Sequence, residues 1–267
     1  MKSFAVLFTI GCAVAFAAQK PNVEAIIQKS VEANRADFNA APQYNYKERD
    51  READGSSKTY QITMIEGTPY QRLIEINGKP ISAAQQADEM RKQEQAAAQR
   101  RAESPDQRKA RIADYEKGRR RDHEMMEQLT KAFDFKLTGT RKLRGLAVWH
   151  FKATPRAGYK PPNMNAQVLP GMQGQLWIDQ KTYQWVRVTA QVIHPVTIEG
   201  FLAQVEPGTR FELEMSPVGE GIWQPSHFSM KSQAKILFVF SHNSQQDSAY
   251  FDYERINGLG HSPTSGK

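Results

Sequence analysis

The chain has 267 residues, a formal net charge of +7 and 39% hydrophobic residues, which suffices for one large domain or two small ones. Its mean hydropathy is −0.65. Its single cysteine lies at position 12, so a disulfide-stapled module or a cysteine-based zinc site is excluded. The positive charge is modest and spread out, which argues against a nucleic-acid-binding protein.

The N-terminus has the pattern of a signal peptide, over residues 1–18. Lys2 precedes the apolar run Phe4–Phe16, and Ala15-Phe16-Ala17 fits the small-x-small cleavage rule. A membrane anchor is the alternative, but a spanning helix needs roughly 20 apolar residues. Lipidation of Cys12 is a further alternative, although Thr9 stands where leucine is usual. We therefore expect cleavage and export to a bacterial periplasm, which suits a large mature domain without cysteine.

A helix and an antiparallel meander are predicted next. Residues 22–38 place Val23, Ile26 and Ile27 near a 3.6-residue period, and Asn22 is a suitable N-cap. Alternating polar and apolar positions, separated by turn residues, then predict three strands at 43–51, 58–66 and 69–76.

The period changes between residues 82 and 132, where Ala, Gln, Glu, Lys and Arg dominate. Ser104-Pro105-Asp106-Gln107 has the pattern of a capping box and divides this insertion into helices at about 82–103 and 105–132. The first helix has almost no large apolar residue and should be solvated, whereas residues such as Leu129 allow the end of the second to dock. Acidic neighbours interleave with Arg119-Arg120-Arg121, which predicts a solvated helix face and not a phosphate site.

Strand periodicity returns at Phe133 and continues nearly to the end. Strands are predicted at 133–137, 146–154, 174–179, 183–193, 209–215, 221–241 and 247–255. Within 183–193, alternation places Val186 and Val188 on one face and Trp185 and Arg187 on the other. The loop at 155–172 and the tail at 258–267 are rich in turn-forming residues, and the tail should be disordered.

These elements predict an α+β fold in a single domain over residues 19–257. A sheet of about ten strands must curl or split. The simplest solution is a strongly curved antiparallel sheet, an unclosed half-barrel, with helices against its concave apolar face. The N-terminal helix and the long charged insertion at 82–132, pictured as a helical hairpin, supply those helices.

The chain lacks recognisable catalytic motifs. Its six histidines are scattered, and no metal-binding histidine pair, nucleophile elbow or phosphate-binding glycine loop is present. Asp179 is interpreted as a turn-former, and Glu212 and Glu214 as a solvated strand face. We therefore predict a protein that is not an enzyme and has no metal or cofactor. A hydrolase whose catalytic residues come from distant positions is the least favoured alternative.

Large apolar residues recur at alternating strand positions. Plain core packing explains any one of them. As a set they predict an apolar cavity for an acyl chain or apolar peptide, held by burial of methylenes at about 0.8 kcal/mol each. The candidate residues are Trp149, Trp177, Trp185, Phe211, Phe228, Met230 and Phe238.

One hairpin resembles a known family. Gly174-Gln175-Leu176-Trp177-Ile178-Asp179, followed by Thr182 to Val188, resembles the G-x-L-W-I-D … x-V-R-V hairpin of the periplasmic lipoprotein-carrier (LolA/LppX-like) superfamily. The resemblance implies an unclosed β-barrel capped by helices that carries or sorts lipids or lipidated proteins in outer-membrane biogenesis. The insertion at 82–132 is longer and more charged than the lid helices of these carriers.

Two functions follow from these observations. The first is a non-enzymatic envelope protein that binds or carries a lipid acyl chain or a lipoprotein. The alternative is an envelope scaffold, in which the helical insertion binds a protein partner. Neither function involves nucleic acid or a membrane-spanning segment.

Overall fold

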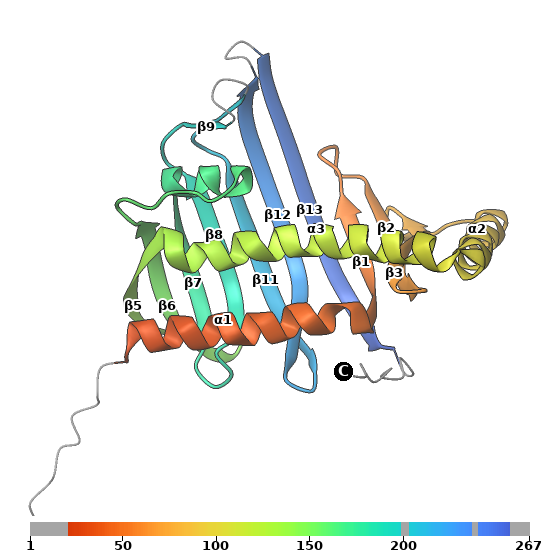
Figure 1. Ribbon diagram of the computed structural model, residues 1–267, viewed down its shortest axis with the longest axis horizontal. Coiled ribbons are helices and arrows are strands. Elements are labelled where there is room, and N and C mark those ends of the chain that lie inside the picture. Colours follow the sequence, from red (N-terminus) through yellow and green to blue (C-terminus); the bar gives the residue numbers. More distant parts are fainter. Residues whose placement is uncertain (1–20, 199–202, 237–239, 257–267) are drawn as a thin grey trace, which may run out of the picture.

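An antiparallel sheet forms the body of the molecule, and helices lie across one of its faces (Figure 1). The computed structural model describes residues 21–198, 203–236 and 240–256. Its strands are β1 Tyr44–Arg51, β2 Ser57–Ile65, β3 Thr68–Ile76, β4 Lys79–Pro80, β5 Phe133–Leu143, β6 Leu146–Pro155, β7 Met172–Asp179, β8 Trp185–Val192, β9 Val196–Ile198, β10 Ala203–Val205, β11 Arg210–Gly219, β12 Ile222–Ile236 and β13 Phe240–Arg255.

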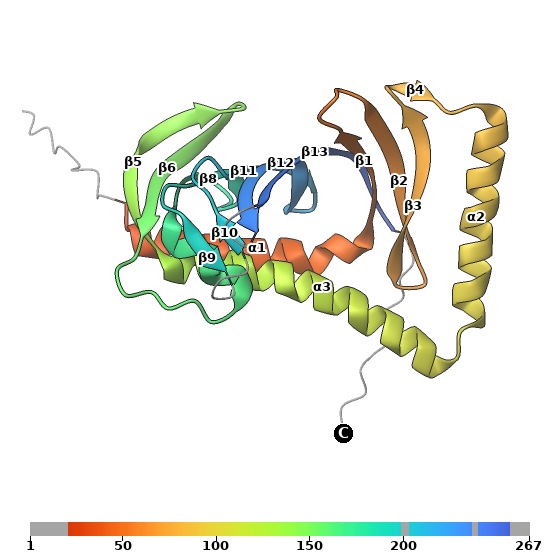
Figure 2. The ribbon, with the colours of Figure 1, turned by 90° about the horizontal axis from the view of Figure 1, so that it is seen from above.

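The sheet is open and curved. Its strand order is β4-β3-β2-β1-β13-β12-β11-β8-β7-β6-β5, and β10 pairs with β12 and with β9. The first long strand pairs with the last, with Tyr44 opposite Arg255. Figure 2 shows the outer strands β1–β3 and β5–β6 turned away from the direction of the central strands. The predicted α+β fold with an unclosed antiparallel sheet is therefore confirmed, and the short strands β4, β9 and β10 raise the strand number to 13.

Two long helices cross the same face of the sheet antiparallel to each other (Figures 1 and 2). Helix α1, Val23–Ala40, begins after Asn22, whose side chain accepts a hydrogen bond from Ala25 N at 3.1 Å. Helix α3, Pro105–Ala132, begins after Ser104 in the predicted capping box. The local sequence thus sets where both helices start.

The remaining long helix, α2 (Ala83–Ala102), stands beside β3 and meets α3 at a corner (Figure 2). None of its residues is buried. The Arg100 guanidinium fixes the corner by donating to the carbonyl oxygens of Ile65, Thr68 and Pro69, in and beside the β2–β3 turn, at 2.9–3.1 Å. Because the end of α2 is bound to the sheet in this way, α2 and α3 diverge and do not pack along each other as a hairpin.

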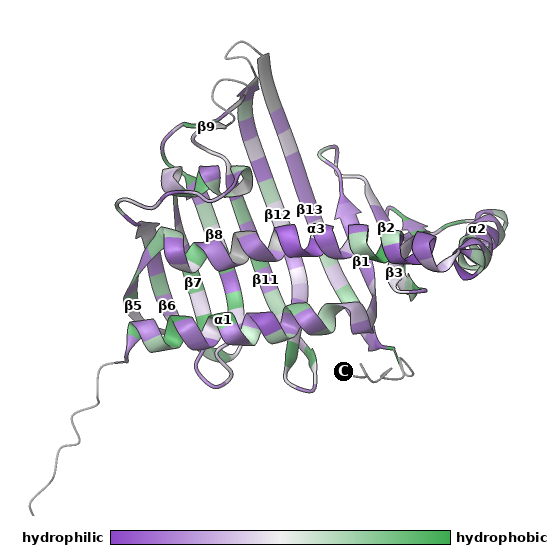
Figure 3. Cartoon of the chain, viewed as in Figure 1, coloured by the Kyte–Doolittle hydropathy of each residue, from purple (hydrophilic) through white to green (hydrophobic). Residues whose placement is uncertain are grey.

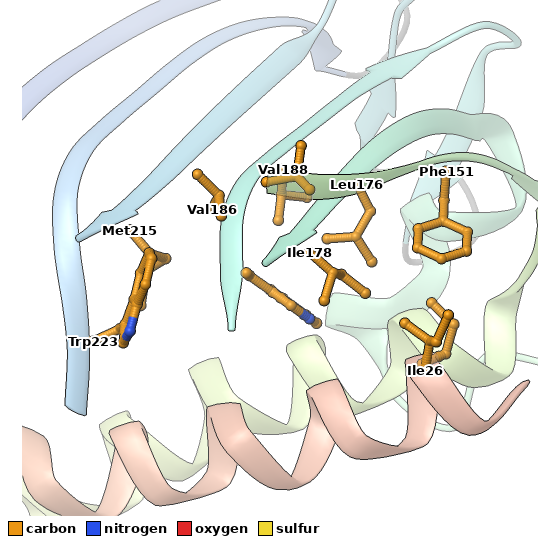
Figure 4. Close-up of a cluster of buried hydrophobic side chains, with 11 residues drawn as sticks. Ile26, Phe151, Leu176, Ile178, Val186, Val188, Met215 and Trp223 are labelled. Carbon is orange, nitrogen blue, oxygen red and sulfur yellow. The ribbon is translucent and has the colours of Figure 1, made fainter. Parts of the chain in front are cut away.

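The main core lies where α1 meets the sheet (Figure 4). Ile26 and Ile27 of α1 pack in one cluster with strand residues that include Phe151 and Ile178, both fully buried. In Figure 3 hydropathy alternates along the central strands, as expected when one face is covered and the other is solvated. The face beneath the helices is therefore the apolar one.

The predicted signal peptide and tail lie outside the described residues. The predicted loop at 155–172 contains a short 3-10 helix, η2, Met164–Gly171. Among the helices that the structure describes, none combines the length and apolar character that crossing a bilayer requires.

Candidate functional site

Helix α1 is tied to the sheet by polar contacts that are themselves buried. The indole N–H of Trp185, on β8, donates to Ser30 Oγ at 3.1 Å. Further along the helix, Asp37 Oδ1 accepts from Trp223 N at 2.9 Å and from Gln184 Nε2 at 3.2 Å. A buried polar group left without a partner costs about 1–3 kcal/mol. These bonds therefore fix both the position of α1 and its rotation about its axis.

Asp37 is a buried acid whose pKa is raised. It is 3% exposed. Burial raises the pKa of Asp37 to about 7, against the opposing effect of the hydrogen bonds from Trp223 N and Gln184. In the described part of the chain, Asp37 Oδ2 and Gln184 Oε1 have no hydrogen-bond partner. The carboxyl therefore changes its charge close to neutral pH, at the contact that holds the end of α1.

Helix α3 is tied to α1 by several side-chain contacts. The Arg119 guanidinium donates to Phe38 O and lies 4.2 Å from the centroid of the Phe38 ring. His123 stacks on the same ring with centroids 4.2 Å apart, and Arg35 pairs with Glu127 at 2.9 Å. The Arg119 side chain is 14% exposed. The prediction of a solvated face for this arginine run is thus wrong at Arg119, because a terminal carbonyl of α1 needs a donor.

An apolar space lies between these helices and the sheet. Its volume is about 30 Å³, which is room for roughly one water molecule. Its walls come from α1, the end of α3 and strands β5–β8 and β11. They are mostly apolar and include Ile27, Leu129, Phe133, Phe135, Leu176, Trp185, Val188, Ala190 and Phe211. The structure thus contains an apolar lining with little free volume inside it.

A wider groove adjoins this narrow space. It has a volume of about 740 Å³ and runs between α1, the end of α3 and the start of β5. Ile27, Thr130 and Phe135 line both the groove and the apolar space. These three side chains therefore form a wall between the wide groove and the narrow apolar space. Arg35 and Arg156 also line the groove, and each is paired with a carboxylate.

A β-bulge decides which tryptophan faces the helices. Trp177 lies opposite Arg187, but Ile178 lies opposite Trp185, so Val186 is an extra residue in β8. The bulge turns Trp185 toward α1, which its indole contacts. Simple alternation predicts Trp185 on the face of Arg187. That prediction is wrong, because alternation fails at the inserted residue.

Trp177 lies on the opposite face of the sheet. The His150 ring stacks on it with centroids 4.6 Å apart and an interplanar angle of 11°. The Arg187 guanidinium lies 5.6 Å from its centroid. Trp177 does not line the apolar space, so the hairpin supplies one tryptophan to each face.

The other predicted residues lie mostly on the side of the helices. Phe211 lines the apolar space directly. Met230 lies opposite Phe211 in the β11–β12 register, and Phe228, two residues earlier on β12, is on the same face as Met230. Neither Met230 nor Phe228 lines the apolar space. Trp149 is half-buried and packs against the core beside it. Phe238 lies outside the described residues.

The lining also contains helix residues to which the sequence assigned no binding role. Ile27 belongs to the apolar stripe of residues 22–38, and Leu129 is an apolar position near the end of the second helix. The periodicity therefore marks both as buried. It does not show that they meet over the same strands, because that depends on where the chain turns.

The two acids whose pKa values are raised to about 7 lie away from this space. Burial raises the pKa of Glu48 to about 7, and Asp50 adds to the rise. Neither Glu48 nor Asp37 lines the apolar space or the groove, whereas an acid–base catalyst must reach its substrate. Within residues 21–198, 203–236 and 240–256 there is also no group of three or more His, Cys, Asp or Glu side chains placed to hold a metal.

Two acidic positions noted in the sequence have structural partners. Asp179 Oδ2 accepts hydrogen bonds from Lys181 N at 3.2 Å and from Thr182 N at 2.8 Å, which confirms its role in the turn. Glu212 and Glu214 lie 2.6 Å and 3.8 Å from the Arg187 guanidinium. The two glutamates are therefore ion-paired on the solvated face.

Neither a scan against models of protein families nor a search of curated proteins finds a match. Among solved structures, the chain is similar to an outer membrane lipoprotein-sorting protein domain from Vibrio parahaemolyticus, with a TM-score of 0.31, 11% identity and coverage of 88% of this chain and 95% of that one. It is similar to a LolA superfamily protein from Nitrosomonas europaea, with a TM-score of 0.32, 11% identity and 88% and 94% coverage. It is also similar to a DUF1329 family protein from Desulfovibrio piger, with a TM-score of 0.30, 11% identity and 89% and 94% coverage. The family that residues 174–188 resemble is thus among these structures.

Proposed function

We propose that the protein binds an acyl chain, belonging to a lipid or to a lipidated protein, between helix α1 and the sheet, and that it carries this ligand without catalysing a reaction. The proposal depends on one observation: a narrow apolar space and a wider groove share the wall formed by Ile27, Thr130 and Phe135. We place this activity in the bacterial periplasm. The leader pattern of residues 1–18 and the resemblance of the hairpin to lipoprotein carriers support that location.

The acyl chain would enter from the groove. The groove volume of about 740 Å³ lies within the range of roughly 300–1,000 Å³ that is usual for small-molecule sites. Displacing the wall joins the groove to the apolar lining, and each methylene that then leaves water contributes about 0.8 kcal/mol. The buried bonds of α1 keep one side of the site in place while the ligand enters.

Phe135 is the side chain best placed to move. It is half-buried and belongs to β5, the last strand in the sheet order, which pairs with β6 alone. A strand with one neighbour loses fewer contacts when it shifts than a central strand does. Ile27, by contrast, is 8% exposed and lies on the helix that the Trp185 and Asp37 bonds hold.

Titration of the purified protein with a fluorescent fatty-acid probe tests the proposal. We expect saturable binding. Ala190→Phe, which fills the apolar space, should weaken it about 10-fold or more, which corresponds to about 1.4 kcal/mol or the burial of two methylenes. Phe135→Ala, which removes the wall, should tighten or accelerate binding. Ala153→Phe fills the same lining from β6 and serves if Ala190→Phe does not fold.

Trp177→Ala is the matched control, because it removes a tryptophan from the same hairpin but on the other face. It should leave probe affinity unchanged. Absence of saturable binding both by the original protein and by the Phe135→Ala variant would exclude the proposed site. Equal loss of binding in Trp177→Ala and Ala190→Phe would show that the probe does not use the apolar space.

Helix α2 favours an alternative function, that of an envelope scaffold. None of its residues is buried, and it stands at the end of the sheet away from the apolar space (Figure 2). Deleting 82–132 would not test this, because α3 helps close the core. Reversing exposed charges on α2, as in Arg91→Glu with Lys92→Glu, leaves the core intact. A scaffold would lose a protein partner in a pull-down after this change, whereas a carrier would keep its acyl-chain affinity.

A further inference from the structure

The face of the sheet away from the helices carries a polar trough of about 660 Å³. It extends over β6, β7, β8, β11, β12 and β13, and Thr138 of the edge strand β5 also lines it. Gln175 and Thr189 contribute to it, and they alternate along their strands with Leu176 and Val188, which line the apolar space. The trough and the proposed acyl-chain site therefore lie back to back on the same strands.

Two rows of side chains cross the strands in this trough. Strand register places one row in the order Lys152, Gln175, Thr189, Glu212, Ser229 and Asp247. The adjacent row is Gln173, Gln191, Arg210, Lys231 and Gln245. The second row thus has two cations at its centre and amides on both sides.

Arg210 and Lys231 form a like-charge pair. They lie directly opposite each other in the β11–β12 register, and both are exposed. Neither forms an ion pair with any residue that the structure describes. The two acids nearest in register contact other side chains: Glu212 lies 2.6 Å from the Arg187 guanidinium and Asp247 lies 3.6 Å from the His227 ring. Like charges directly opposite on a sheet are destabilising, so an anion between them would relieve a cost that the free protein bears.

We propose that this trough binds an anionic oligosaccharide, whose carboxylate or phosphate group lies between Arg210 and Lys231. The guanidinium fork binds such groups through two parallel hydrogen bonds, and an ammonium adds a point charge. The amides of Gln191 and Gln245 flank the cations in the same row. Each amide both donates and accepts hydrogen bonds, which matches the hydroxyl groups of a sugar.

A sugar fits this surface better than an acidic peptide does. A peptide strand binds a sheet through an unpaired edge, but Arg210 and Lys231 lie on β11 and β12, which have neighbours on both sides. The trough also lacks large apolar anchors for peptide residues: Phe211 and Met230 border it, but their side chains lie on the helix side of the sheet. Many polar groups spread across a broad surface suit a ligand that carries a hydroxyl on almost every carbon.

Titration calorimetry with defined probes tests this inference. We expect tetragalacturonate to bind and neutral maltotetraose to bind at least about 10-fold more weakly, since a charge-assisted hydrogen bond is worth about 1.5–3 kcal/mol. Raising the salt concentration should weaken binding of the charged sugar. Glucose 6-phosphate and inorganic phosphate show whether a phosphosugar replaces the uronate or whether a bare anion suffices.

Arg210→Gln and Lys231→Gln should each reduce tetragalacturonate affinity by about 10-fold. Lys58→Gln, which removes the same charge from an exposed position on β2, is the control and should leave affinity unchanged. Equal affinity for maltotetraose, equal binding of inorganic phosphate, tighter binding of a tetraglutamate peptide, no binding at all, or no effect of the two substitutions would each overturn the proposal.

A second measurement uses the melting temperature, first without ligand and then with it. If Arg210 and Lys231 repel each other in the free protein, Arg210→Gln should raise its melting temperature slightly, while Lys58→Gln should not. Tetragalacturonate should then raise the melting temperature of the original protein more than that of Arg210→Gln. A lowered melting temperature in free Arg210→Gln would show that the pair is not strained. The acyl-chain probe should bind all these variants equally, which separates this inference from the proposed function.

Discussion

The indole N–H of Trp185 donates to Ser30 Oγ across 155 positions of sequence, and both side chains are buried. Trp185 reaches α1 because Val186 forms a bulge in β8. The position of α1 on the sheet therefore depends on this hydrogen bond, and the hydrogen bond depends on the bulge. Helix α1 forms a fixed wall of the proposed acyl-chain site.

Ser30→Ala should lower the free energy of unfolding by about 1–3 kcal/mol, because it leaves the Trp185 N–H buried without an acceptor. Urea denaturation measures the change. Ser244→Ala, at an exposed position of β13, is the control and should have almost no effect. Adding Trp185→Phe removes the donor as well, so the double variant should lose less stability than the two single losses added together. Strict additivity would mean that the bond contributes nothing.

Asp37→Asn should change how stability depends on pH. The pKa of Asp37 is raised from its ordinary value near 3.8 to about 7. A raised acid contributes stability that is fully present below about pH 4 and is lost as pH rises through about 7. Asparagine has no such titration and keeps an acceptor for Trp223 N. The variant should therefore gain stability relative to the original protein between pH 4 and 8, by at least about 1.4 kcal/mol, the equivalent of one pKa unit.

Denaturation at a series of pH values measures this difference. Burial also raises the pKa of Glu48 to about 7, but Glu48 is present in both proteins, so its contribution cancels in the comparison. A difference that stays constant from pH 4 to pH 8 would show that Asp37 titrates near its ordinary value.

The same glycine-to-alanine change should lower the stability of the protein at one position and raise it at another. A Cβ at Gly174 would lie 2.6 Å from Thr189 O, a backbone atom on β8. Gly174→Ala should therefore destabilise the protein by about 1–3 kcal/mol. Gly118, in the middle of α3, has no atom within 4 Å of the same construction. Gly118→Ala should stabilise the helix by up to about 1 kcal/mol. Thermal unfolding compares them, and a stabilised Gly174→Ala variant would show that β7 and β8 have room between them.

Arg100→Lys should loosen the corner between α2 and α3. An ammonium group lacks the planar fork that reaches the carbonyls of Ile65, Thr68 and Pro69 together. Hydrogen exchange should become faster in the β2–β3 turn and in the adjoining helix ends. Arg101→Lys changes the neighbouring, exposed arginine and should leave exchange as it was. Unaltered exchange in both variants would mean that the corner is held by other contacts.

The sequence predicts well what depends on local periodicity. The stripe of Val23, Ile26 and Ile27 and the cap at Asn22 define α1, and the capping box at Ser104 sets the start of α3. Alternation predicts strand structure in every strand longer than three residues, but it joins 221–241 into one strand, whereas β12 ends at Ile236 and β13 begins at Phe240. These features were predictable because each is encoded by residues that are neighbours in the chain.

The sequence does not predict what depends on a single inserted residue or a distant partner. Trp185 changes face because Val186 interrupts the pairing of two strands. Arg119 docks on Phe38, 81 positions away. The pairing of Arg210 with Lys231 requires the register of β11 against β12. The apolar space is narrow because side chains from two helices and five strands meet in it, and periodicity does not reveal such a meeting.

One edge of strand β1 pairs with β13, which places Tyr44 opposite Arg255. The backbone partners of β1 on this side therefore come from a distant part of the chain. A ribosome or an export channel delivers the N-terminal segment first. Until the final strand arrives, the early meander has an open border with unsatisfied backbone groups, and contacts this remote in sequence form slowly. The exposed edge of β1 can therefore pair with other chains until β13 is available to cover it.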